Sequence, residues 1–141
     1  MTEISFYVGS NNTLRSRLLL ACRIVEKARQ HNLAVHIHTD SFSTTRQMDE
    51  ILWTWNETSF IPHTSQITDD TEEAVTIASD YEPIKNCDYL INLSNQCPDF
   101  FSRFTKMAEI IDQSETILAA GRERYTFYKN RGYTLKYYKL P

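Results

Sequence analysis

Glycine is scarce in this chain, which holds only Gly9, Gly121 and Gly132 among its 141 residues. The turn after the first expected strand reads VGSNNT and contains a single glycine. A dinucleotide-binding turn needs several glycines so that the backbone can approach the pyrophosphate, and a P-loop needs a glycine-rich run that ends in Gly-Lys-Ser/Thr. The sequence therefore argues against a nucleotide site of either kind, and we expect no cofactor.

Cysteine is equally scarce. Cys22, Cys87 and Cys97 are too few and too irregularly spaced for a disulfide framework or a tetrahedral zinc site. The N-terminal stretch MTEISFYVGS lacks a basic region followed by an apolar run, and no segment approaches 18 apolar residues. These absences favour a reduced, cytoplasmic protein, and the length predicts one domain over residues 1–141 that folds alone.

Charge is distributed unevenly along the chain. The net charge is −3, but residues 121–141 carry six basic side chains and one acidic one, which gives +5 there and −8 in residues 1–120. Five tyrosines are interleaved with these basic residues, as in single-strand binders that hold phosphates and stack bases. A wholly basic nucleic-acid binder is nevertheless disfavoured by the acidic remainder of the chain.

Strand and helix patterns alternate along the sequence. Ser114 is a candidate cap and Gly132 a candidate stop for the final helix, and Asp99 is a candidate cap for a short one. We expect strands at 3–8, 33–39, 74–79, 87–94, 107–113 and 134–140, and helices at 14–30, 40–55, 97–105 and 114–132. This order predicts an α/β fold with a mostly parallel, Rossmann-like sheet and helices on both faces, although it does not give the strand order.

Two groups of side chains suggest a metal site. His36 and His38 share one strand face, and His63 or Asp40 is a conceivable third ligand. The second group is the acidic run of Asp69, Asp70, Glu72 and Glu73. The plainer interpretations are a covered strand face and a solvated loop. We expect no metal, and a metal-dependent enzyme remains an alternative only if one of these groups holds one.

The second helix leaves one tryptophan off its apolar face. Its expected core positions are Met48, Ile51, Leu52 and Trp55, and Trp53 points about 150° away from them. An indole near solvent is a common interface anchor. The alternative is that a neighbouring loop covers it.

The final helix carries a mixed stripe beside its core face. The core direction contains Ile117, Gly121, Tyr125 and Tyr128, and the edge contains Leu118, Arg122 and Lys129. Apolar surface next to a guanidinium suits a peptide that ends in a hydrophobic side chain and a carboxylate, because arginine binds a carboxylate through two hydrogen bonds. The alternative is an ordinary helix rim with a snorkelling arginine.

Several of these stretches together resemble one protein family. They are the strand motif SFY (5–7), Leu52-Trp53 followed by SFIPH (59–63), and the pattern RERY...Y...GY that runs from Arg122 to Tyr133. In this order the chain resembles the chi subunit of bacterial DNA polymerase III, a clamp-loader accessory protein. The resemblance covers nearly the whole chain, but residues 64–86 follow no pattern of the family.

The resemblance implies a non-enzymatic adaptor with a parallel α/β fold. Its partners would be the psi subunit and the acidic C-terminal tail of single-stranded DNA-binding protein, with nucleic acid bound only indirectly. By position, Phe60 matches the aromatic residue that contacts psi, next to Pro62. The tail pocket would comprise Arg122 and Tyr125 with Trp53, Ile111, Leu118 and Lys129.

Leu118 departs from the family pattern. It stands where the family can carry a basic residue, and Lys129 would supply part of the missing charge. The alternative function is a direct single-stranded nucleic-acid binder that uses the basic, tyrosine-rich C-terminus. Binding to bare oligonucleotide with a steep salt dependence would distinguish it from the adaptor.

Overall fold

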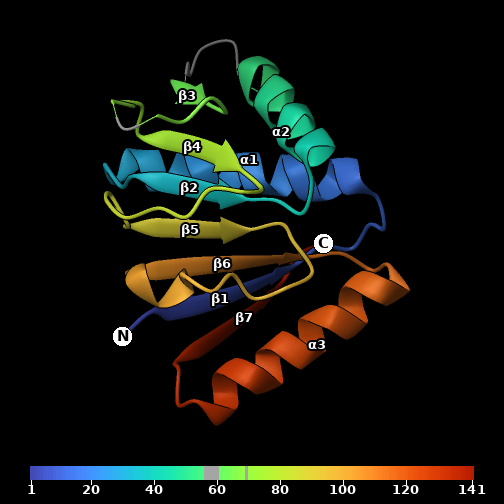
Figure 1. The fold of residues 1–141 in the computed structure, drawn as a ribbon. Helices are drawn as coiled ribbons and strands as arrows, with labels where there is room; N and C mark the ends of the chain where they lie inside the picture. The colour runs from blue at the N-terminus through green and yellow to red at the C-terminus, as the bar shows by residue number, and fades with distance from the viewer. Residues whose placement is uncertain (56–60, 69) are drawn as a thin grey trace.

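The computed structural model describes residues 1–55, 61–68 and 70–141, so Phe60 and Asp69 lie outside the described residues. Within them, seven parallel strands form one sheet in the order β3-β4-β2-β5-β6-β1-β7 (Figure 1). The strands are β1 (Glu3–Val8), β2 (Val35–His38), β3 (His63–Thr64), β4 (Val75–Ala78), β5 (Tyr89–Asn92), β6 (Lys106–Ile111) and β7 (Leu135–Lys139). The helices are α1 (Leu14–Gln30), α2 (Phe42–Thr54), the short 3-10 helix η1 (Phe101–Arg103) and α3 (Glu115–Asn130). The predicted parallel α/β sheet is confirmed.

The helices cover opposite faces because the chain reverses direction across the sheet. The connections from β1 to β2 and from β2 to β3 run toward the β3 edge, whereas the connection from β6 to β7 runs toward the β7 edge. Parallel crossovers share one hand, so opposite directions place their helices on opposite faces. Accordingly α1 and α2 pack over one buried cluster and α3 over another (Figure 1).

Local sequence explains the first two helices. Thr13 caps α1 by accepting a hydrogen bond from the Ser16 amide at 3.2 Å, and Ser41 caps α2 by accepting one from the Thr44 amide at 3.1 Å. The buried stripe of α1 includes Leu18, Cys22 and Val25. Strand 3–8 and helix 14–30 have the predicted bounds. No helix in the described part of the chain is long and apolar enough to cross a membrane.

Local structure differs from the sequence-based expectations at three places. The two-residue strand β3 was not predicted, because so short an edge strand leaves no alternating pattern. Asp99 caps no helix, since the expected helix is only a 3-10 turn preceded by Phe100 without a side-chain cap. Ser114 occupies the N-cap position of α3, as predicted, but its hydroxyl donates to the Asn12 carbonyl at 3.1 Å and makes no side-chain cap bond.

Candidate functional site

A pocket of about 410 Å³ lies between α3 and the strands β1, β6 and β7. Its sheet side is formed by Phe6, Val8, Ile111 and Tyr137, and its helix side by Leu118, Gly121, Arg122, Tyr125 and Thr126. Apart from Arg122, Thr126 and two tyrosine hydroxyls, these side chains are apolar. The pocket can therefore take a small apolar group with a polar or charged end.

Gly121 sets the distance between α3 and the sheet. A Cβ atom at this position would lie 2.7 Å from the Ile111 Cδ1 atom, closer than real Cβ contacts. The absence of a side chain therefore lets α3 approach β6 directly beside the pocket. Because Ile111 is buried, its side chain has little room to move away.

Arg122 is the cation of the pocket. Its side chain is exposed, and within residues 1–55, 61–68 and 70–141 the guanidinium has no hydrogen-bond or ion-pair partner. Tyr125 packs edge-on against Phe6 with ring centroids 5.2 Å apart and against Tyr137 at 6.5 Å. Three aromatic rings that pack against one another thus border the pocket next to the Arg122 guanidinium, which has no described ion-pair partner.

The structure brings together four of the six residues expected in one pocket. Ile111, Leu118, Arg122 and Tyr125 all line it. Lys129 is exposed in the last turn of α3 and is not among the lining residues. The helical spacing of three or four residues was sufficient to find the three positions on α3.

Trp53 lies elsewhere. It belongs to α2, on the sheet face opposite α3, and its ring packs on His63 with centroids 4.4 Å apart (Figure 1). The indole is 52% exposed. His63 follows the exposed Pro62, so Trp53 is grouped with the segment expected to bind psi. Phe60, the main residue expected there, lies outside the described residues.

A buried ionic network anchors α3 to the sheet, and it was missed in the sequence. Arg124 Nε donates to Glu109 at 3.0 Å, Tyr128 Oη donates to the same carboxylate at 2.6 Å, and Asn92 donates to its other oxygen at 2.9 Å. Burial raises the pKa of Glu109, and the Arg124 charge and these hydrogen bonds oppose that rise. Glu109 is two residues from both Met107 and Ile111, so all three side chains point to the same face of β6. This period of two was the available signal for an inward carboxylate.

The candidate metal ligands do not converge. Among the described residues, no group of three or more His, Cys, Asp and Glu side chains is placed to hold a metal ion. His63 instead contacts the Ile61 carbonyl at 2.7 Å and Asp49 Oδ1 at 3.3 Å. His36 and His38 do share one face, where both rings pack near Phe100. In the acidic run, the described members Asp70, Glu72 and Glu73 are all exposed.

The C-terminal basic and aromatic residues do not form one surface. Arg124 is buried in the ionic network, and Arg131 lies over the Phe127 ring at 4.3 Å. Tyr137 faces α3, whereas Tyr138 stacks on Tyr7 on the other face of the sheet, with centroids 5.1 Å apart. Sequence proximity therefore overstated the size of the basic patch.

Comparison with known proteins gives consistent matches along the chain. Residues 1–136 match the family model described as DNA polymerase III chi subunit, HolC. The DNA polymerase III subunit chi of Pseudomonas aeruginosa is 33% identical over 141 residues, which cover 100% of this chain and 99% of the relative. The Escherichia coli subunit chi is 27% identical over 143 residues, which cover 96% of each chain. The chain belongs to the DNA polymerase III chi subunit family, whose members are non-catalytic accessory subunits of the replicative polymerase.

Proposed function

We propose that the chain is a replication adaptor that links the clamp loader, through the psi subunit, to the C-terminal tail of single-stranded DNA-binding protein. The observation that carries the proposal is the pocket on α3, which combines an apolar interior with the guanidinium of Arg122, a group without an ion-pair partner in the described part of the chain. Such a pocket suits a peptide that ends in an apolar side chain and a free carboxylate.

The terminal residue of the tail occupies the interior of the pocket. Its side chain packs against Ile111, Leu118 and Tyr125, and its carboxylate accepts hydrogen bonds from Arg122. Arginine suits this role because its planar fork matches the two carboxylate oxygens.

The acidic residues that precede the terminus find less positive charge. Leu118 adds apolar area on the helix side of the pocket and offers no charge. Lys129 is exposed further along α3 and lies within reach of a longer peptide. The proposal therefore assigns most of the affinity to the terminal residue.

Replacing Arg122 by Ala should weaken tail-peptide binding by about ten- to a hundredfold, because a hydrogen bond to a charged group contributes roughly 1.5–3 kcal/mol. Arg122→Lys should recover only part of the loss, since an ammonium lacks the planar fork. Amidating the peptide C-terminus should mimic Arg122→Ala, and combining the two changes should cost much less than their sum. Calorimetric titration with an acidic peptide that ends in Asp-Phe measures each case.

The matched control is Arg131→Ala, which removes the same charge from the end of α3 where the guanidinium rests on Phe127. This variant should bind the peptide like the parent. If Arg122→Ala and the amidated peptide both bind as tightly as the parent pair, the tail does not dock in this pocket.

We assign the psi-binding surface to the β3 edge of the sheet, around Pro62, which follows in sequence the segment that carries Phe60. Pro62 is exposed there, and Trp53 presents half of its indole next to His63. We therefore transfer Trp53 from the tail pocket to this surface. The two partners would then bind at well-separated sites.

Phe60→Ala should reduce psi binding by about 2 kcal/mol or more, the usual cost of losing an aromatic interface anchor. Trp53→Ala should also weaken binding to psi while leaving binding to the tail peptide unchanged. Pull-down titration with psi and thermal melts of the free protein test both variants. Loss of several kcal/mol of folding stability in Phe60→Ala would instead identify Phe60 as a core residue.

A further inference from the structure

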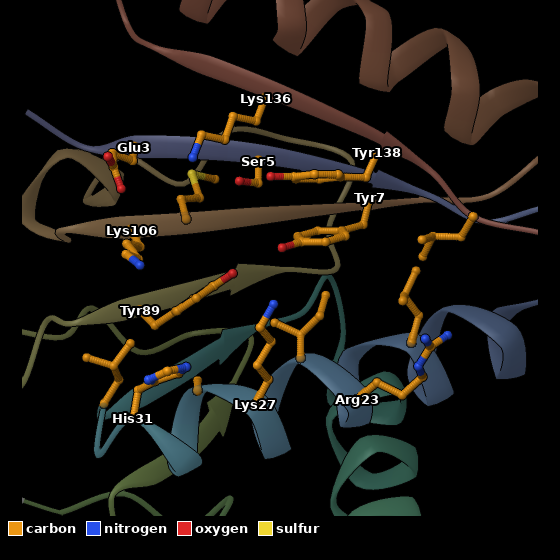
Figure 2. Close-up of a pocket in the computed structure, with 16 residues that line it drawn as sticks. Glu3, Ser5, Tyr7, Arg23, Lys27, His31, Tyr89, Lys106, Lys136 and Tyr138 are labelled. Atoms are coloured by element: carbon orange, nitrogen blue, oxygen red, sulfur yellow. The ribbon is translucent and has the colours of Figure 1, made fainter.

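A second groove, of about 400 Å³, lies on the sheet face opposite the α3 pocket (Figure 2). Its base is the part of the sheet beside α1, with Tyr7 on β1, Tyr89 on β5 and Lys136 and Tyr138 on β7. No described helix covers β1 and β7 on this face, since α1 and α2 lie toward the β3 side (Figure 1). The adaptor function proposed above does not use this surface.

Strand register determines which side chains share the groove. Tyr7 pairs with Tyr138 and Ser5 with Lys136, so all four point to the same face of β1 and β7. The Tyr7 and Tyr138 rings stack with centroids 5.1 Å apart and planes 20° apart. Tyr138 remains 41% exposed, which leaves ring surface available to a ligand.

Positive charge surrounds these rings. Arg23 and Lys27 come from α1, Lys106 from β6 and Lys136 from β7, while Glu3 is the one acid among the described lining residues. None of the four cations forms an ion pair with a described acid. The groove thus concentrates uncompensated positive charge in a chain whose net charge is −3.

The polar groups face one another across the groove. Figure 2 shows Lys136 reaching in from the β7 side and Lys27 from α1, with the hydroxyls of Tyr7, Tyr89 and Tyr138 directed between them. The Tyr89 hydroxyl is protonated at neutral pH like that of any tyrosine, and burial raises its pKa further. Phosphate oxygens need this combination of cations and donors.

We infer that this groove binds single-stranded DNA, with phosphates on Lys27, Lys106 and Lys136 and a base on the exposed side of the Tyr7–Tyr138 stack. Exposed aromatic residues on adjacent strands, bordered by cations, form the platform on which single-strand binders stack bases without sequence preference. An acidic peptide would use the cations but gain nothing from the stacked rings. A duplex offers no free base face. Of the two single-stranded polymers, DNA is the one to which the family membership points.

The test is fluorescence anisotropy of the full chain with a labelled oligothymidylate at low salt. We expect a Kd of about 1–100 μM at physiological salt, typical of non-specific electrostatic binding, and tighter binding at low salt. With the three lysines engaged, the slope of log K against log salt should be about −2.1, because single strands contribute roughly −0.7 per phosphate contact. Lys136→Ala should make that slope shallower, at about −1.4.

Matched variants separate the groove from general charge effects. Lys136→Glu should raise the Kd for the oligonucleotide at least fivefold. Lys139 is on the same strand but outside the lining of the groove, so Lys139→Glu should change that Kd by no more than about twofold. Tyr138→Ala should reduce the affinity for the oligonucleotide about 5- to 100-fold, whereas Tyr138→Phe should bind like the parent, because the ring does the stacking. Thermal melts of all variants check the fold.

Other outcomes would overturn the inference. They are no binding at low salt, equal loss in Lys136→Glu and Lys139→Glu, or equally tight binding of duplex DNA, RNA or an acidic peptide. Arg122→Ala, which tests the α3 pocket, should leave oligonucleotide binding unchanged. Failure of the groove is thereby distinguishable from failure of the proposed adaptor function.

Discussion

The core of this chain contains buried polar side chains, among them Glu109 and His36. Glu109 is fully buried among Arg124, Tyr128 and Asn92, each of which donates a hydrogen bond to its carboxylate. Removing one partner of such a group leaves a charge without compensation in a medium of low polarity. The network therefore orients α3, whose edge beside the sheet carries the pocket residues Arg122 and Tyr125.

His36 is a second buried polar side chain, on β2. Its Nδ1 atom lies 2.7 Å from the Thr76 hydroxyl, and its ring is packed near Tyr81 and Phe100. Burial, with a smaller contribution from His38, lowers its pKa to about 3. The imidazole is thus neutral in the folded protein at neutral pH and serves as a polar core residue.

The depressed pKa of His36 makes folding stability depend on pH. Between about pH 3 and 6.5 the unfolded chain binds a proton at His36 that the folded chain does not, so stability falls as the pH falls through this window. The free energy of unfolding should lose about 1.4 kcal/mol per pH unit from this group. His36→Gln, which retains a partner for Thr76, should show a correspondingly smaller slope in urea titrations between pH 4 and 6. Equal slopes in the two proteins would contradict this role, and above pH 7 their difference should be constant.

At the scale of elements, sequence patterns were reliable where one face is apolar and the other polar. The period of two in EISFYV and the capped helix after it gave β1 and α1 with their observed bounds. The final helix and its core-facing residues were located, but Arg124 was missed, because it is buried through its pairing with Glu109. Hydrophobic periodicity cannot identify a buried charge when its partner lies on a distant strand.

The terminal strand shows a related limit. Its alternating side chains were interpreted as one basic and aromatic surface, but the pleat sends Tyr137 toward α3 and Tyr138 toward α1. Both faces of β7 are partly exposed, so no apolar side identified the orientation. The pocket on α3 was nevertheless predictable in part, since Leu118, Arg122 and Tyr125 lie within two turns of one helix.

At the scale of the whole molecule, one sheet carries two pockets back to back. β1 and β7 contribute Phe6 and Tyr137 to one face and Tyr7 and Tyr138 to the other. Neighbouring residues of a strand point to opposite faces, so ligands on the two sides are separated by the thickness of the sheet. Strand order, which the sequence did not supply, is what gives the two pockets the strands β1, β6 and β7 in common.

This arrangement predicts that a tail peptide and a single-stranded oligonucleotide bind at the same time. The two pockets share no lining residue, and Arg122 and Lys136 lie on opposite faces of the sheet. The acidic peptide would compete with the oligonucleotide for any cation that both used. Unchanged oligonucleotide binding in the presence of peptide would therefore show that the two ligands use different cations. Saturating tail peptide should change the oligonucleotide Kd by less than about twofold, a coupling free energy below about 0.4 kcal/mol. Anisotropy titrations with and without peptide measure this, with the amidated peptide as the control for ionic strength. A loss of oligonucleotide binding in proportion to peptide occupancy would mean that both ligands use one basic surface, and the assignment of separate faces would then be wrong.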